Sequence, residues 1–273
     1  MPPRATPLVP RTDWDPRFVS AHPAHAILAR AAACFATARE WPAPATWRGA
    51  LDAGGLGAPL VSAGGASLVF ALQPPRPKSR RRRAPVDMGA LYDERIYVRG
   101  EVPSRARSWH DFLNMLVWAT LPATKRAINA RQRAALRAHV ADGAARIPGA
   151  RTREQDALAM FDEGGVLVLA TERTAAAVAR VVERADPDAL AALVRANGAA
   201  VLALGHALHE HLLSSDSTVR ALALPLVVDA LPAALEERVA LADAALAAAL
   251  DERRVLRGPT GALALPVAAA LFG

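Results

Sequence analysis

The sequence is short of cysteine, lysine and aromatic residues, and it lacks long apolar runs. Cys34 is its only cysteine, so neither a disulfide within the chain nor a cysteine-based zinc site can form. Such scarcity is typical of proteins from a reducing compartment, and we expect a cytoplasmic protein. No apolar run reaches the roughly 20 residues of a membrane span, and the Pro-rich start has no apolar segment of a secretory signal. We therefore expect no contact with a membrane.

Aromatic residues make up 5% of the chain, although 52% of it is hydrophobic. The apolar residues are mainly Ala, Leu and Val, which favour helices that pack closely across small side chains. At 273 residues the chain can bury a substantial core without disulfides. We expect a predominantly helical α+β fold in which a small hairpin or mixed sheet packs on a helical core.

Apolar spacing, capping residues and Gly or Pro breakers divide the chain into expected elements. We expect helices at 22–40, 45–53, 91–98, 108–120, 122–142, 153–162, 173–184, 187–196, 206–213 and 231–251. The expected strands are a hairpin of 60–61 with 67–72 and a buried strand at 166–170, while 221–228 fits a strand or a helix. Residues 100–107 are expected to form a loop, and the apolar tail at 263–272 is expected to dock on the body.

A Pro- and Arg-rich segment at 74–85 separates N-terminal helices and a hairpin at 1–73 from a main helical domain at 86–273, and we expect one compact domain overall. The segment carries Arg80, Arg81, Arg82 and Arg83. Like charges beside prolines are typical of a solvated loop, and the alternative is contact with the phosphates of nucleic acid or another polyanion. The net charge of +7 comes almost entirely from arginine in a chain rich in Ala and Pro, so it adds little to that alternative.

Rare residue types gather between 92 and 129. Lys, Asn, Tyr, Ile and Phe, which have AT-rich codons, occur 17 times in this Ala- and Arg-rich chain, and eight of these residues fall in that window. A uniform distribution would place roughly two there. Packing or function therefore constrains side-chain identity in this window, at Tyr92, Ile96, Tyr97, Phe112, Asn114, Lys125, Ile128 and Asn129.

Ionisable side chains interrupt apolar elements at three places, which are His110, Asp111 and Asn114, then Asp162 and Glu163, then His206 and Glu210. The pairs His110–Asn114 and His206–Glu210 are four residues apart, so each shares a helix face. Each place also fits a structural role, as a helix cap or as a buried hydrogen-bonded pair. Because unpaired polar groups are costly to bury, three such places indicate one shared network. His209 and His211 are expected at the surface.

Two histidines with up to four carboxylates suit a divalent metal ion or general acid–base catalysis. The expected metal ligands are His110, Asp162, His206 and Glu210. The expected catalytic residues are His110, Asp111, Asn114, Glu163 and Arg105. Arg95, Arg105 and Arg107 would bind an anionic group by bidentate hydrogen bonds. The sequence contains no metalloprotease, serine hydrolase or nucleotide-binding motif that would make the assignment more specific.

Three hypotheses therefore compete. The first is a metal-dependent or acid–base hydrolase that acts on a small anionic substrate. The second is a non-catalytic module in which the same network fixes the fold while a basic surface binds nucleic acid or another polyanion. The third is a purely structural network in a protein that binds a protein partner. Bound metal that is lost on substitution of either histidine would favour the first hypothesis.

The rare-residue window and the later polar clusters also contain a specific set of motifs. They are Tyr92, Glu94-Arg95-Ile96, Gly100, Val102-Pro103, Arg105, Trp109-His110-Asp111-Phe112, Asn114, Val117-Trp118, Pro122, Thr124-Lys125, Asn129, Asp156-Ala157-Leu158, Phe161-Asp162-Glu163, Gly165-Val166, Gly205-His206-Ala207-Leu208 and Glu210. Over 92–225 this set resembles the bacterial family called domain of unknown function 3025. The resemblance implies a proteobacterial cytoplasmic protein without an established activity. The sequence departs from the family at Gly164, where Ser is usual, and by its basic segment at 74–85.

Overall fold

The computed structural model describes residues 13–56, 59–73, 87–141, 151–213, 219–258 and 263–272. The α-helices are α1 (Ala29–Ala33), α2 (Pro44–Ala53), α3 (Tyr92–Arg99), α4 (Trp109–Thr120), α5 (Pro122–His139), α6 (Arg153–Gly164), α7 (Glu172–Glu183), α8 (Pro187–Arg195), α9 (His206–Leu212) and α10 (Leu235–Asp251). The strands are β1 (Val69–Leu72), β2 (Glu101–Ser104), β3 (Gly165–Thr171), β4 (Ala199–Ala203), β5 (Arg220–Val228) and β6 (Leu263–Pro266), and the 3₁₀-helices are η1 (Phe18–Ala21), η2 (Pro23–Leu28), η3 (Met88–Ala90) and η5 (Ala269–Phe272). The predominantly helical α+β fold expected from the sequence is confirmed.

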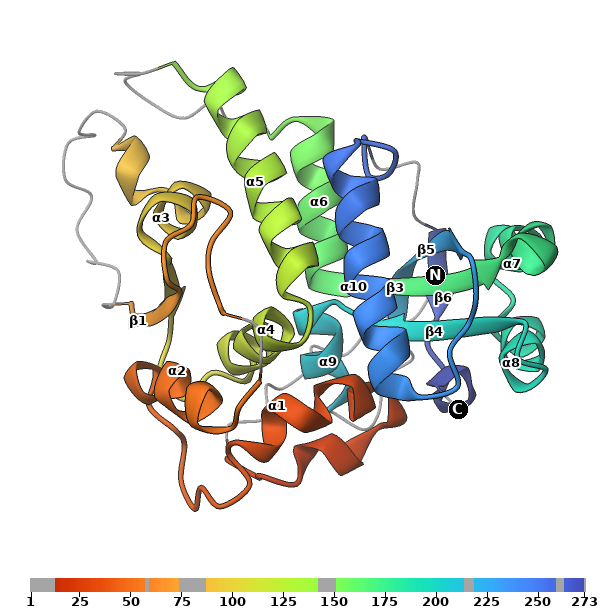
Figure 1. The fold of residues 1–273 in the computed structure, drawn as a ribbon, viewed down its shortest axis with the longest axis horizontal. Coiled ribbons are helices and arrows are strands. Elements are labelled where there is room, and N and C mark those ends of the chain that lie inside the picture. Colours follow the sequence, from red (N-terminus) through yellow and green to blue (C-terminus); the bar gives the residue numbers. More distant parts are fainter. Residues whose placement is uncertain are drawn as a thin grey trace, which may run out of the picture.

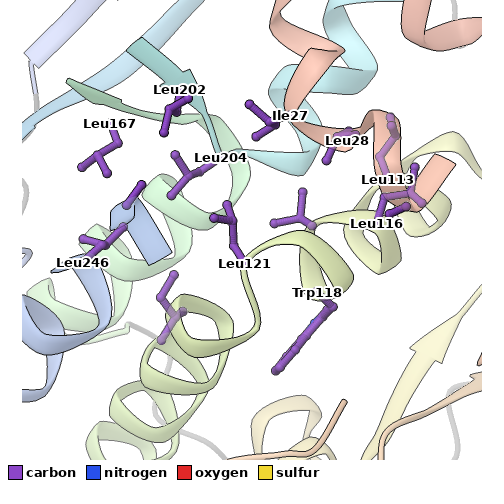
Figure 2. Packing of buried hydrophobic residues seen from close by; sticks show 14 of the residues in the cluster. Ile27, Leu28, Leu113, Leu116, Trp118, Leu121, Leu167, Leu202, Leu204 and Leu246 are labelled. Atoms are coloured by element: carbon purple, nitrogen blue, oxygen red, sulfur yellow. The ribbon is translucent and has the colours of Figure 1, made fainter. Parts of the chain in front are cut away.

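The larger sheet has the order β4-β3-β5-β6, with β3 antiparallel to β4 and parallel to β5. Alternate residues of β3 face opposite ways. Leu167 joins the cluster that contains Leu246 of α10 (Figure 2), whereas Val168 packs with residues of α7 and α8 on the other face. A strand that is covered on both faces is apolar throughout. The buried strand predicted at 166–170 is therefore confirmed, and the undecided segment 221–228 is a strand.

The helix expected at 22–40 is wrong over most of its length. The chain forms the 3₁₀-helix η2 and then one short α-helix, which ends at Ala33. Beyond Cys34 the backbone makes turns, and the carbonyl oxygen of Ala38 accepts a hydrogen bond at 2.8 Å from the indole N–H of Trp14. The Trp14 ring stacks on Trp109 of α4. Tertiary packing of the N-terminal segment thus prevails over the helical spacing of its apolar residues, many of which are Ala.

The expected hairpin of 60–61 with 67–72 forms only next to its turn, where Val61 and Ser67 make an antiparallel bridge and the backbone N–H of Leu68 donates to the carbonyl oxygen of Leu60 at 2.9 Å. Strand β1 instead pairs in parallel with β2, which occupies the expected loop at 100–107. Gly100 permits this pairing, since it ends α3 with a φ of 67° and lies so close to the Ser67 carbonyl that a side chain would clash.

Helices α5, α6 and α10 stand side by side, and α3 with β1 and β2 lies on the other side of α5 from the larger sheet (Figure 1). Helix α5 buries the polar side chains of Lys125, Asn129 and Arg131. Arg131 donates to Glu154 and to the carbonyl oxygen of Leu256. Buried polar groups on one helix indicate that it borders a polar interior. No helix in the described part of the chain is both long and apolar enough to cross a membrane.

A buried histidine pair ties the N-terminal segment to α9. The Nδ1 atoms of His25 and His209 are 3.0 Å apart, and neither side chain is exposed, so the expectation of a surface His209 is wrong. The Nε2–H of His209 donates to the carbonyl oxygen of Ala203, which leaves its Nδ1 to accept from His25. Burial lowers the pKa of His25 to about 2 and that of His209 to about 4.

This histidine pair predicts that the protein loses stability in mild acid. In the unfolded chain both imidazoles would titrate near pH 6.5, so the unfolded state takes up protons first as the pH falls. The contribution of the two imidazoles to the free energy of unfolding is fully present above pH 6.5. Each pH unit below 6.5 lowers this free energy by about 1.4 kcal/mol for each imidazole. We expect the melting temperature to fall steeply between pH 6.5 and pH 4.5.

The double variant His25→Leu, His209→Leu should show a flatter pH profile. His211→Leu, at an exposed position on α9, should keep the steep profile, and parallel profiles for all three proteins would contradict the prediction.

Candidate functional site

Gly205 brings α9 against the end of α6. A Cβ atom at position 205 would lie 2.4 Å from the backbone oxygen of Glu163, so no larger residue fits there. The backbone N–H groups of Leu204 and Gly205 both donate to the carbonyl oxygen of Gly165, each at 3.0 Å. These contacts hold His206, the first residue of α9, beside Glu163.

His110, on the first turn of α4, meets His206 at this point. Ser108 caps α4 as expected and fixes where the helix begins, because its side chain accepts the backbone N–H of Asp111. The Nε2 atoms of the two imidazoles are 3.1 Å apart. Glu163 Oε2 lies 4.0 Å from Nε2 of His110 and 3.7 Å from Nε2 of His206. The structure thus gathers two expected metal ligands and one expected catalytic carboxylate around a common point.

Two further carboxylates lie behind the imidazoles. The Nδ1–H of His110 donates to Oε2 of Glu210 at 3.2 Å, because a carboxylate can only accept. Nδ1 of His206 lies 3.8 Å from Oδ2 of Asp162. The proton on Nδ1 of His110 leaves Nε2 of a neutral His110 as an acceptor, whereas Nδ1 of His206 has no hydrogen-bond partner among the described residues. Glu210 and Asp162, both expected as metal ligands, therefore contact the far side of the imidazoles from the shared point.

The two imidazoles differ in proton affinity. Burial lowers the pKa of His206 to about 3, so this ring is neutral at physiological pH. The hydrogen bond to Glu210 raises the pKa of His110 against the opposing effect of burial, and the charge of Glu163 raises it further. A neutral imidazole is the form that binds a metal ion, and His206 meets that requirement without any other change.

Lys125 of α5 forms a buried ion pair beside the imidazoles. Its Nζ donates to Oδ1 of Asp162 at 2.5 Å and to Oδ1 of Asn114 at 2.9 Å, and the lysine is 4% exposed. Nδ2 of Asn114 in turn donates to the Tyr92 hydroxyl at 3.3 Å. Burial works to raise the pKa of Asp162, but the lysine charge holds it below its usual value. Asn114, expected to be catalytic, is thus held between two residues of the rare-residue window.

Two of the three arginines expected to bind an anion, Arg95 and Arg105, have carboxylate partners. The guanidinium of Arg105 donates to both oxygens of Asp111, at 2.8 and 2.9 Å, and its backbone N–H donates to the same carboxylate at 2.6 Å. Arg95 donates to Glu101 at 2.8 Å. Arg107 lies exposed in a turn with a φ of 53°. Asp111 therefore orients Arg105, and neither residue lies at the point that the imidazoles share.

A pocket of about 1370 Å³ opens beside the imidazoles, between α3, α4, α5 and α6. Its wall includes His110 and His206, and it continues along Tyr92, Asp162 and the buried side chains of Asn114, Trp118, Lys125 and Asn129. Ligand pockets typically measure ~300–1,000 Å³. This one is large enough for a ligand that reaches well beyond the imidazoles.

Sequence reasoning did not assign a role to Tyr92, Lys125 or Asn129 in the pocket. The signal was nevertheless present, because all three belong to the rare-residue window at 92–129. Trp118 is buried in the hydrophobic core with Leu113 and Leu116, and its ring also lines the pocket.

Glu210 offers a direct test of whether the site holds a metal. A carboxylate behind a metal-bound histidine fixes the ring and makes it more basic, and its loss typically weakens metal affinity ~10–100-fold. We expect this loss for Glu210→Gln, because the amide keeps the shape but not the charge. Competition with a zinc-binding dye measures it. Glu236→Gln makes the same change at an exposed position of α10 and should keep wild-type affinity. Equal affinities in the two variants would contradict the prediction.

A family model described as "Protein of unknown function (DUF3025)" matches residues 81–269. No curated protein and no solved structure matches the chain. The matched range contains His110, Glu163 and His206, together with the pocket residues from Tyr92 onwards.

Proposed function

Since the chain belongs to the DUF3025 family, whose members share no described activity, its function has to come from its own geometry, and we propose that it is a metal-dependent hydrolase. A single divalent ion would be held by His110, Glu163 and His206. Glu163 takes the place among the ligands that the sequence had assigned to Asp162 and Glu210. Each of these two contacts the back of an imidazole instead.

The observation that carries the proposal is the approach of the two Nε2 atoms to 3.1 Å, with Oε2 of Glu163 within 4.0 Å of both. At this distance the two nitrogen atoms need either a proton or a metal cation between them, because two lone pairs would repel each other. The carboxylate of Glu163 points to the same place. The three ligand atoms lie between 3.1 and 4.0 Å from one another, so His110, His206 and Glu163 would together hold a zinc ion, whose bonds to N and O are about 2.0–2.2 Å long.

Three protein ligands leave a coordination position for water, which is the arrangement of catalytic rather than structural zinc. When bound there, the ion would supply a hydroxide near neutral pH and would polarise a carbonyl or phosphoryl oxygen of the substrate. The side chain of Glu163 is 52% exposed, so this position would open towards solvent and the pocket. Because Arg95 and Arg105 are paired, we assign substrate attraction to the ion rather than to these arginines.

Acid–base hydrolysis without a metal is the second candidate, because a proton between the two Nε2 atoms also relieves their repulsion. His110, with its raised pKa, would then donate to the neutral His206. The polyanion-binding hypothesis depends on Arg80, Arg81, Arg82 and Arg83, which lie outside the described residues, so it stays a prediction. A cytoplasmic location also stays a prediction, supported by the single cysteine.

Hydrolysis of chromogenic substrates tests the proposal. The zinc-loaded protein would be assayed with p-nitrophenyl acetate, N-acetylalanine p-nitroanilide and p-nitrophenyl phosphate, which cover ester, amide and phosphoester bonds. We expect turnover of at least one substrate, loss of turnover with EDTA and recovery with zinc. Glu163→Gln should be inactive, and Glu236→Gln should match the wild type. EDTA-resistant turnover would favour the acid–base candidate, and stoichiometric zinc binding without turnover of any substrate would refute a hydrolase.

A further inference from the structure

Tyr92 joins α3 to α4 at the wall of the pocket. Its hydroxyl oxygen accepts a hydrogen bond at 3.3 Å from Nδ2 of Asn114. Both residues line the pocket, and Tyr92 is 45% exposed, so a ligand can reach its side chain. Asn114 lies one turn after His110 on α4, and side chains at this spacing are neighbours, with Cβ atoms about 5–6 Å apart. The tyrosine hydroxyl therefore lies on the same stretch of wall as the proposed metal centre.

Lys125 fixes the direction of the hydrogen bond between Asn114 and Tyr92. An ammonium group has only donors, so the atom of Asn114 that lies 2.9 Å from Nζ of Lys125 must be the amide oxygen. The amide nitrogen then faces Tyr92, and the phenol oxygen has to be the acceptor. Lys125 is itself held by its buried ion pair with Asp162. The orientation of Asn114 thus follows from the charge of its neighbour.

The proton of the Tyr92 hydroxyl has no acceptor in the described part of the chain. A phenol carries a single proton, and Asn114 already donates to its oxygen, so the O–H has to point away from Asn114. Desolvation in the pocket and the charge of Asp162 raise the pKa of Tyr92, so the hydroxyl keeps its proton near neutral pH. Tyr92 therefore offers a hydrogen-bond donor to a ligand in the pocket.

Two charged donors of the same wall, by contrast, are bonded to carboxylates. Lys125 donates to Asp162, and the guanidinium of Arg105 donates to Asp111. A ligand oxygen that binds to either cation has to compete with a carboxylate. The hydroxyl of Tyr92 is uncharged and is already oriented by Asn114, so its hydrogen bond to a ligand breaks no ion pair.

We infer that Tyr92 contacts the substrate, and that its hydroxyl donates a hydrogen bond to an oxygen of the carbonyl or phosphoryl group that is hydrolysed. This role rests on the proposed function. Such an oxygen gains negative charge as hydrolysis proceeds, and a donor that is oriented in advance stabilises that charge in the transition state. Tyr92 is thus a catalytic residue, and Asn114 and Lys125 are positioning residues that orient its hydroxyl.

The chain has only two tyrosines, so carbon nuclear magnetic resonance can follow each of them in the full-length protein. In protein labelled with ¹³Cζ-tyrosine, Tyr92→Phe identifies the signal of Tyr92. Tyr97 is the internal control, because it lies on the same helix and its ring packs against the guanidinium of Arg133, 3.9 Å away. Methylphosphonate is the probe, since its tetrahedral oxygens resemble those of a hydrolytic intermediate. It should shift the Tyr92 signal saturably in the zinc-loaded protein and leave the Tyr97 signal unchanged.

The same variants measure the size of the effect. Tyr92→Phe should bind methylphosphonate about tenfold more weakly, as expected for the loss of a hydrogen bond to a charged group. For the chromogenic ester, amide or phosphoester that the wild type hydrolyses, it should lower kcat by about 100-fold and change KM far less. Zinc content and the melting curve should stay those of the wild type. Tyr97→Phe removes the other phenol hydroxyl and should match the wild type in every measurement.

The outcomes separate this inference from the proposed function. If zinc-dependent turnover is found but Tyr92→Phe keeps wild-type affinity and kcat, or methylphosphonate does not move the Tyr92 signal, the role of Tyr92 is overturned and the hydrolase stands. If the wild type binds no zinc, the proposed function fails, and the tyrosine signal still decides the inference. A saturable shift by methylphosphonate in that protein would keep Tyr92 as a ligand-binding residue, and an unmoved signal would refute it.

Discussion

Alanine at position 206 is expected to remove the bound metal. His206 would supply one of three ligands, and the remaining imidazole and carboxylate cannot hold a divalent ion against dilution. Changes behind a ligand cost ~10–100-fold in affinity, so loss of the ligand itself should cost more than about 100-fold. Elemental analysis after gel filtration should find one zinc ion for each wild-type chain and none in the variant. His110→Ala should give the same result.

Folding and metal loss can be separated by comparing variants. His206 is 4% exposed, so its removal also leaves a cavity. Glu163 is half-exposed, and Glu163→Gln should keep the circular dichroism spectrum and melting curve of the metal-free protein while it loses zinc. His211→Ala, on the exposed face of α9, should retain one zinc ion. Stoichiometric zinc in Glu163→Gln would rule out this ligand set, and metal-free wild-type protein after purification with added zinc would rule out the site.

The sequence singled out side chains that the structure brings together, but it could not assign the partners of each one. His110 and His206 stood out as ionisable residues in apolar helices, and the structure brings their Nε2 atoms together. Asp162 and Glu163 could not be told apart, because adjacent residues at a helix end point about 100° from each other. The first turns inward to Lys125 and the second turns towards the imidazoles. Only the position of α5 in the fold decides which of the two carboxylates pairs with Lys125.

The fold itself was predictable where the pattern was local. Strand β3 and the capped helix α4 follow from runs and caps that lie within a few residues. The parallel pairing of β1 with β2 joins residues such as Phe70 and Val102, and no local signal encodes it. The burial of His209 likewise depends on η2, which lies at the other end of the sequence and supplies His25.

Methionine in place of Lys125 is expected to lower the free energy of unfolding by about 3–5 kcal/mol, because it leaves the carboxylate of Asp162 without its cation. Oδ1 of Asn114 would lose its donor as well. Methionine nearly matches the length and volume of the lysine stem, so the loss comes mainly from the charge. Urea denaturation of the metal-free protein measures the effect, since bound zinc would add stability of its own.

The double variant Lys125→Met, Asp162→Asn tests the cause of this loss. Because both charges are removed together, we expect it to be more stable than Lys125→Met alone, with a coupling energy of about 1–3 kcal/mol. Arg254→Met breaks an ion pair with Glu252 in which both side chains are more than half exposed, and it should change stability by less than about 1 kcal/mol. If Lys125→Met were no more damaging than Arg254→Met, the pocket would not depend on this ion pair. The lysine would then be a dispensable group in a solvated cleft.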